Sequence, residues 1–384
     1  MSNAENVPEF AQLNNGMNPD DLKEAISRSG YPFQARVAAS LRSRLANHFN
    51  DVNIQEEWEY IDSETQQARS VDIFADIGVL NFDRRVYKSP LMPIFCRLNL
   101  IIECKQSENP YIFFLRDAPP EGAPSFPEML GPIKEEVKVF ARNNEGEVRD
   151  SATVLSVRDL LGFYEFDFVL PPLPYAVSLA KAVRNRSKLE ITGEETYRSL
   201  TYPLLKAVDH LKATVKSGAP SELQERFIVP IAVVRAPMIG SVFSEEGEQN
   251  LISLPWVRVS RMEPARISVA GKNSGAVIRY YDVVHESYLD TYVDVLAEAL
   301  IEISRRVMAH PSELRHGAGS SESFVQSYRS LEPLPDDFRE NRERLPTYMK
   351  AIYPSVTLTD DQEDFHGSAS GTNSIGWAFP NLGT

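Results

Sequence analysis

The segment 98–105, LNLIIECK, constrains the fold of this chain more than any other. A nearly continuous apolar run of this length is typical of a strand at the centre of a sheet, buried on both faces. Ahead of it, partial alternation of apolar and polar residues predicts an antiparallel hairpin of two strands, at about 52–61 and 70–77. Apolar residues at four-residue spacing predict a helix at about 32–49. Residues 31–106 therefore read as one helix followed by three strands.

Later segments add further elements of both kinds. The apolar spacing of 194–216 predicts a helix, and FIVPIAVV at 227–234 predicts a buried strand. Pro230 lacks a backbone donor, so we expect this strand to be irregular or to lie at an edge of the sheet. Residues 175–186 follow a proline-rich breaker and are predicted as a helix. The pattern as a whole predicts an α/β protein whose mixed sheet is flanked by helices.

Changes in composition divide the chain into five parts. We expect the polar leader to start a short helix at Pro19, with Asn18 as its cap, and the acidic and Gly/Ser-rich tail to be flexible. The parts are a leader at 1–30, the first part of a core at 31–110, an insertion at 111–190, the second part of the core with a long helix at 191–312, and an extension at 313–384.

Composition excludes several classes of protein. The 384 residues carry 40 Lys and Arg against 54 Asp and Glu, a net charge of −14, which argues against coating nucleic acid by bulk charge but leaves a local basic groove open. The two cysteines, Cys96 and Cys104, exclude a disulfide framework and fit a reducing compartment. No apolar run approaches the roughly 18 residues of a membrane span, and the N-terminus shows no secretory signal. We therefore expect a cytoplasmic protein with no membrane partner.

The candidate catalytic and metal-binding residues lie at the end of the most apolar strand. Residues two apart in a strand share a face, so Glu103 and Lys105 project together, and Asp72 on the neighbouring strand can bring its carboxylate beside Glu103. Two converging carboxylates, with a backbone carbonyl near Cys104, form a hard oxygen site suited to Mg²⁺ or Mn²⁺. Carboxylates more than about 8 Å apart would exclude a shared ion.

This arrangement resembles the PD-(D/E)XK nuclease superfamily, the restriction-endonuclease-like fold. Its core runs α-β-β-β-α-β, with an Asp at the second strand and Glu-x-Lys at the end of the third, and SVDIFA at 70–75 and LIIECKQ at 100–106 match these positions. The resemblance implies a Mg²⁺-dependent nuclease that cleaves phosphodiester bonds, in DNA rather than RNA, with a role such as bacterial restriction or antiviral defence. It implies that Asp72 and Glu103 hold the metal and that Lys105 positions or activates water. It also makes a homodimer or a protein partner plausible.

One position departs from the family pattern. Many relatives carry an acidic residue on the first helix, where this chain has Gln34, which we assign as an outer-shell helper. The departure keeps open a non-catalytic binding module on the same fold, within a larger complex. A further alternative is another α/β fold in which Glu103 and Lys105 merely pair with each other. Asp76 shares the face of Asp72 and is either a substitute ligand or a solvated strand end.

A second cluster is basic. Residues 181–216 hold eight Lys and Arg against four Asp and Glu, in a chain that is strongly acidic. We predict that this cluster contacts a nucleic-acid backbone, and the alternative is a solvated helix face. The histidines show no metal-ligand spacing, and the sequence contains no P-loop or Gly-x-Ser-x-Gly motif. The candidate nucleic-acid-binding residues are Lys181, Arg184, Arg186 and Lys188.

Overall fold

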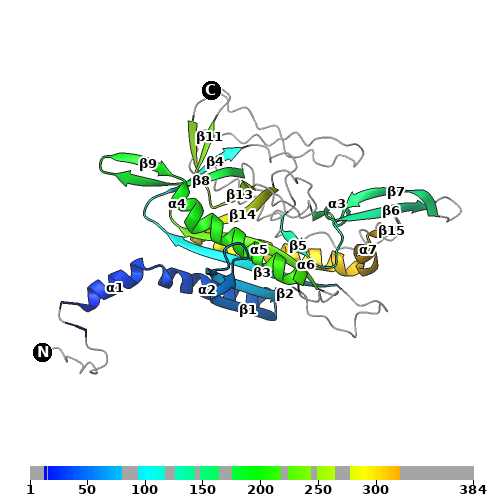
Figure 1. The fold of residues 1–384 in the computed structure, drawn as a ribbon, viewed down its shortest axis with the longest axis horizontal. Helices are drawn as coiled ribbons and strands as arrows, with labels where there is room; N and C mark the ends of the chain where they lie inside the picture. The colour runs from blue at the N-terminus through cyan, green and yellow to red at the C-terminus, as the bar shows by residue number, and fades with distance from the viewer. Residues whose placement is uncertain are drawn as a thin grey trace.

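The fold is a large mixed sheet flanked by helices, seen in a computed structural model (Figure 1). The predicted α/β class is therefore confirmed at this level. Most of the C-terminal extension, including the tail that we expect to be flexible, lies outside the described residues. The structure describes residues 13–14, 16–79, 94–116, 126–142, 148–163, 175–217, 224–243, 249–263 and 277–320.

The first part of the core is a helix followed by a meander of three strands. Helix α2 (Tyr31–His48) begins after Gly30, whose left-handed φ of 89° suits glycine and turns the chain out of α1 (Pro19–Arg28). Strands β1 (Asp51–Ile61), β2 (Ala68–Gly78) and β3 (Phe95–Gln106) pair antiparallel in sequence order. The predicted α-β-β-β order is confirmed, with boundaries that move by three residues at most.

The second part of the core returns to the same sheet. A helical stretch runs through α4 (Glu194–Thr196), the π-helical turn η3 (Tyr197–Thr201) and α5 (Tyr202–Ser217), and leads to β10 (Gln224–Arg235). Strand β10 lies parallel to β3 along its whole length. The expectation that Pro230 places its strand at an edge is wrong, because β10 is a central strand between β3 and β14, but its pairing on the β14 side is interrupted at 229–230. The proline fits there because it falls between residues 226–228, which pair with β5, and 231–234, which pair with β14.

Beyond β10 the sheet continues through strands from distant parts of the sequence. Within the described residues it has twelve strands, with the path β1-β2-β3-β10-β14-β13-β8-β4-β11-β12, while β5 joins β10 and β9 joins β8. The range 111–190, set apart above as an insertion, thus contributes several strands to the main sheet. The bounds of the added strands are β4 (Tyr111–Arg116), β5 (Glu128–Leu130), β8 (Tyr175–Asn185), β9 (Lys188–Thr192), β11 (Met238–Phe243), β12 (Gln249–Ser253), β13 (Trp256–Glu263) and β14 (Val277–His285).

The helix predicted at 175–186 is wrong, because this segment is strand β8. Its alanines favour a helix locally, but partner strands decide its conformation. Strand β4 pairs with it antiparallel, β13 joins it in parallel at one residue, and β9 forms a hairpin with its outer end. Lys181, Arg184, Arg186 and Lys188 therefore lie on a hairpin and not on a helix face.

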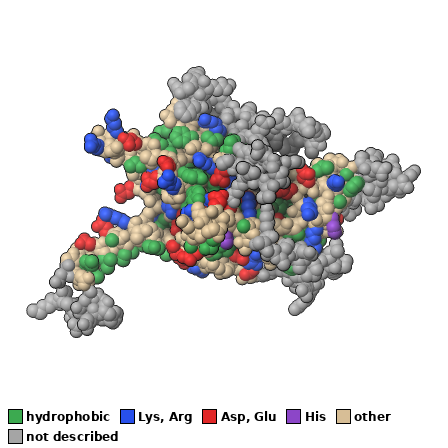
Figure 2. Space-filling model, in the orientation of Figure 1, with side chains coloured by type: hydrophobic (Ala, Val, Ile, Leu, Met, Phe, Trp, Pro, Cys, Tyr) green, Lys and Arg blue, Asp and Glu red, His purple; other side chains and the backbone are tan. Residues whose placement is uncertain are grey.

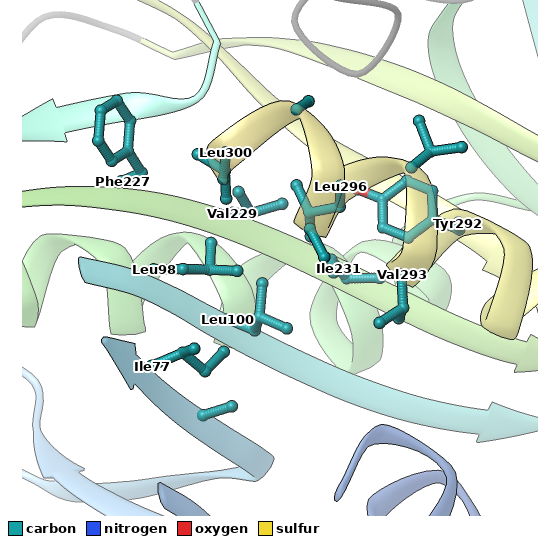
Figure 3. Packing of buried hydrophobic residues seen from close by; sticks show 14 of the residues in the cluster. Ile77, Leu98, Leu100, Phe227, Val229, Ile231, Tyr292, Val293, Leu296 and Leu300 are labelled. Carbon is teal, nitrogen blue, oxygen red and sulfur yellow. The ribbon is translucent and has the colours of Figure 1, made fainter. Parts of the chain in front are cut away.

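Helices cover both faces of the core strands. On one face, α2 and the long helix α6 (Leu289–Ala309) pack over β2, β3 and β10, and on the other face α5 packs over the same strands. Figure 3 shows Leu296 and Leu300 of α6 above Val229 and Leu98. Both leucines are fully buried, and replacing one such residue with alanine costs about 2–5 kcal/mol. This packing holds the ends of β2 and β3 in place.

A smaller unit contains the remaining elements. Strands β6 (Glu136–Arg142), β7 (Val148–Ser156) and β15 (Ala318–Ser320) form a three-stranded sheet, with α3 (Val157–Leu160) and α7 (Pro311–His316) beside it. A short 3₁₀ turn, η4 (Glu286–Tyr288), leads into α6. Among the described helices, none has the length and apolar character needed to cross a membrane.

Candidate functional site

The candidate site lies where β2 and β3 part. The paired residues of these strands run from Gly78–Arg97 to Ile73–Ile102, so Asp72 and Glu103 come directly after the ladder. Beyond that point a side chain replaces the backbone pairing, because the N–H of Cys104 donates to Asp72 Oδ2 at 2.6 Å. The carboxylate of Asp72 is therefore fixed by the backbone of the neighbouring strand.

Lys105 lies between the two carboxylates. Its Nζ is 2.7 Å from Glu103 Oε2 and 3.7 Å from Asp72 Oδ2. The triangle formed by these three atoms keeps the carboxylate oxygens below the limit of roughly 8 Å for a shared ion. The structure thus brings together Asp72, Glu103 and Lys105, the three residues of the sequence motif. Sequence spacing explains the contact of Lys105 with Glu103 but not its contact with Asp72, which lies on another strand.

Gln34 reaches the site from α2, on the other side of the sheet. Its Nε2 donates to the backbone carbonyl of Asp72 at 2.9 Å, and its side chain is buried. Gln34 therefore fixes the backbone of Asp72 through its side-chain amide. Its role in the structure is to position Asp72.

Burial controls the electrostatics of Glu103. This carboxyl is 3% exposed, and its pKa is raised to about 7, mainly by burial, with Asp72 and Glu57 adding to the rise and Lys105 opposing it. Burial acts to lower the pKa of Lys105, but the two carboxylates raise it above its usual value. The ammonium group therefore stays charged at neutral pH, whereas Glu103 changes its protonation there.

Two residues near this site escaped sequence reasoning. Glu57 of β1 falls opposite Asp72, between the pairs Glu56–Ile73 and Trp58–Val71 in the β1–β2 register. Its φ of 52° is left-handed, which is rare for a residue with a side chain and often marks a functional constraint. Tyr111 of β4 lies close enough to Lys105 for the ammonium to lower its pKa, although burial raises it overall. The acidic run at 56–59 was the only sequence signal for Glu57.

Other residues singled out above lie elsewhere. Asp76 lies four residues along β2 from Asp72 and binds Arg97 and Asn99, each at 2.8 Å, so its partners are structural. The four basic residues are on the β8–β9 hairpin, whose β8 pairs with β4 so that Lys181 is opposite Tyr111. The base of the hairpin is therefore next to Tyr111, whose pKa the Lys105 ammonium acts to lower.

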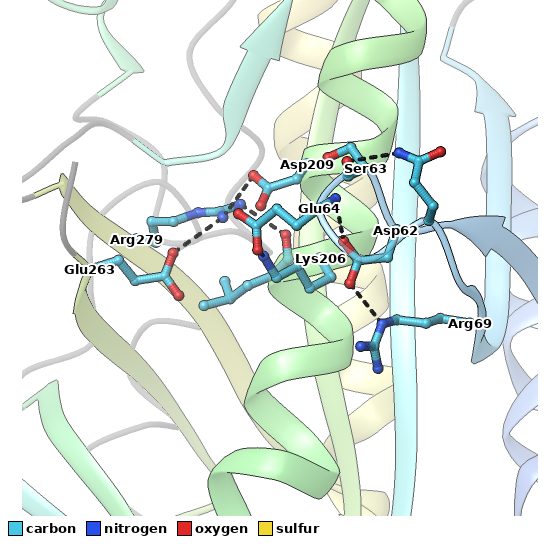
Figure 4. Close-up of polar contacts among 10 residues, drawn as sticks. Asp62, Ser63, Glu64, Arg69, Lys206, Asp209, Glu263 and Arg279 are labelled. Carbon is cyan, nitrogen blue, oxygen red and sulfur yellow. Dashed lines mark hydrogen bonds and ion pairs between the residues drawn. The ribbon is translucent and has the colours of Figure 1, made fainter. Parts of the chain in front are cut away.

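A second charged cluster joins the turn after β1 to α5 and β14 (Figure 4). Asp62 binds Arg69 at 2.8 Å, and Arg279 lies 2.9 Å from Asp209 and 3.6 Å from Glu263. Burial acts to raise the pKa of Asp62, but the N–H of Glu64 and the guanidinium of Arg69 lower it to about 2. Opposite charges are paired throughout the labelled residues, so we interpret the cluster as a structural ion-pair network.

Within the described part of the chain, no group of three or more His, Cys, Asp or Glu side chains is arranged to hold a metal ion. An ion between Asp72 and Glu103 would therefore draw its other ligands from the backbone and from water, as Mg²⁺ commonly does. The chain matches no protein-family model, no curated protein and no solved structure.

Proposed function

We propose that this protein is a divalent-metal-dependent nuclease with a restriction-endonuclease-like core. The core consists of α2, the meander β1-β2-β3, helix α5 and strand β10, which lies beside β3 and parallel to it. The observation that carries the proposal is the convergence of Asp72, Glu103 and Lys105 where β2 and β3 part. Two acids and a lysine at such a point have the chemistry that phosphodiester hydrolysis needs.

The donor set fits Mg²⁺ or Mn²⁺. The N–H of Cys104 points to Asp72, and in a strand the carbonyl of a residue points to the same side as its N–H. Asp72, Glu103 and the Cys104 carbonyl would therefore hold the ion through oxygen atoms alone. The bound ion would supply Lewis-acid activation of the phosphodiester. A cation would also stabilise the buried carboxylate of Glu103, whose pKa is about 7 without one.

Two further side chains, Lys105 and Gln34, have different roles in the proposed reaction. Lys105 carries an ammonium that can donate hydrogen bonds to the attacking water or to the charged phosphoryl oxygens. Gln34 acts through Asp72, whose backbone carbonyl it binds, and is a positioning residue. Binding a phosphate would draw the Lys105 ammonium away from the two carboxylates that it now contacts.

A second candidate is a non-catalytic binding module on the same fold. The observation in its favour is Gln34, which gives the site one carboxylate fewer than the family pattern. Calorimetric titration with Mn²⁺ separates the two candidates, because a nuclease must bind the ion through Asp72 and Glu103. Binding that is lost in Asp72→Asn supports the nuclease, and the absence of binding in the unaltered protein favours the module.

A further inference from the structure

The β8–β9 hairpin stands out as a basic ribbon on an acidic protein. Figure 1 shows it extending from the body on the same side of the molecule as α1, and Figure 2 shows Lys and Arg side chains at its outer end. Residues 181–192 hold four cations and one carboxylate, against a net charge of −14 for the whole chain. All residues from Arg184 to Ile191 are exposed. An anionic partner therefore matches its charge.

Both faces of the ribbon's outer end are open to a partner. Arg184 pairs with Leu189, and Asn185 pairs with Lys188, so a guanidinium and an apolar side chain share one face. Leu189 is 62% exposed and Ile191 is 51% exposed, so the ribbon offers apolar side chains to a partner beside its cations. Cations that contact phosphates or guanine, and apolar groups that contact thymine methyls, are the two kinds of contact used in the major groove.

We propose that the β8–β9 ribbon enters the major groove of B-form duplex DNA. The major groove of B-DNA, about 12 Å wide, admits a two-stranded ribbon, whereas that of A-form RNA is too narrow. This inference rests on the proposed nuclease function, and it names the substrate class as double-stranded DNA.

The ribbon also has the right place and reach. Its base, at Lys181, pairs with Tyr111, which lies close enough to Lys105 to interact electrostatically with its ammonium. The four steps along the strand from Lys181 to Asn185 span about 13 Å at roughly 3.3 Å per residue. That reach exceeds the groove depth of about 8.5 Å, so the tip can lie in the groove while the backbone nearby lies at the site.

The test measures binding in EDTA, so that no cleavage occurs. Fluorescence anisotropy would follow duplex DNA of about 20 base pairs, the same sequence as duplex RNA, and the single DNA strand, over a range of salt concentrations. Wild type is expected to prefer duplex DNA. The ribbon variant is Arg184→Ala/Arg186→Ala/Lys188→Ala. The control, Lys134→Ala/Lys138→Ala/Arg305→Ala, removes the same charge from β6, from the loop before it and from α6.

The ribbon variant should bind duplex DNA at least tenfold more weakly than the control at low salt. Three lost phosphate contacts should also reduce the slope of log affinity against log salt by about 2.7. Equal affinities of the two variants for duplex DNA, or wild-type preference for the single strand or for RNA, would overturn the ribbon proposal. In that case, metal-dependent cleavage by wild type would still support the nuclease. Duplex binding through the ribbon without any cleavage would instead reject the nuclease and leave the ribbon as a DNA-binding element.

Discussion

The buried carboxyl of Glu103 should make the binding of divalent ions depend strongly on pH. Its pKa is raised to about 7 by burial, with Asp72 and Glu57 adding to the effect and Lys105 opposing it. Below pH 7 an ion must displace the proton from this carboxyl. Each further pH unit should then weaken the apparent affinity about tenfold, so binding at pH 5 should be roughly 100-fold weaker than the limiting affinity reached above pH 7.

The same pKa affects the stability of the protein without metal. The folded pKa lies above the ordinary value of 4.5, so the folded state binds this proton more tightly than the unfolded state does. Stability from Glu103 is therefore complete below about pH 4.5 and is lost as the pH rises to about 7. The loss amounts to about 3 kcal/mol. A cation at 100 times its dissociation constant returns about the same amount at pH 8.

Thermal unfolding with and without Mg²⁺, at pH 5 and at pH 8, measures this coupling. Mg²⁺ should raise the Tm at pH 8 by about 5 °C, at roughly 2 °C per kcal/mol, and should raise it by about 1 °C or less at pH 5. Glu103→Gln should abolish the response. Glu225→Gln is the matched control, since Glu225 is another buried acid, with a pKa raised to about 8 by burial, at the opposite end of the paired strands β3 and β10. The reasoning is refuted if Mg²⁺ stabilises equally at both pH values, or if Glu103→Gln responds as wild type does.

Three further changes test the site and the packing elsewhere in the sheet. Gln34→Glu should lower the Tm without metal by an amount equivalent to about 1–3 kcal/mol, because a carboxylate would face a backbone carbonyl. Mn²⁺ should restore the Tm, and an unchanged Tm without metal would contradict this. Gly240→Ala should cost about 1–3 kcal/mol in urea unfolding, since its Cβ would overlap buried leucine and isoleucine side chains, while Gly193→Ala, with its nearest atom at 3.8 Å, should be tolerated. Asp282→Asn should cost about 3–5 kcal/mol, because Arg258 is 0% exposed and its guanidinium binds Asp282 at 2.7 Å; a loss below 1 kcal/mol would contradict a buried ion pair.

The parts of the fold that sequence predicts well are those set by local periodicity. The helix before β1 and the first three strands follow from apolar spacing, because each element buries one face or both faces in a single core. The helix prediction for the β8 segment failed because its alanine-rich sequence allows a helix, and only its pairing with β4 and β13 makes it a strand. The prediction of an edge strand from Pro230 failed for a related reason, since the position of the proline depends on which residues the neighbouring strands leave unpaired.

The candidate site divides in the same way. The motif of Asp72, Glu103 and Lys105 is visible in sequence, because strand period 2 places the last two on one face. Their contacts also require β2 and β3 to separate after Ile73 and Ile102, which is a property of the sheet. Glu57 enters only through the β1–β2 register and a left-handed backbone, neither of which local pattern encodes.

The most direct test of the central claim is a cleavage assay. Wild type would be incubated with single- and double-stranded DNA and RNA, with Mg²⁺, with Mn²⁺ and with EDTA, beside Lys105→Ala, Asp72→Ala and Arg305→Ala as an exposed control. We predict cutting of duplex DNA by wild type and Arg305→Ala that needs the metal and is lost in the other two variants. Equal cutting by all four proteins, or no cutting of any substrate by wild type, would contradict the assignment of a nuclease centre to Asp72, Glu103 and Lys105.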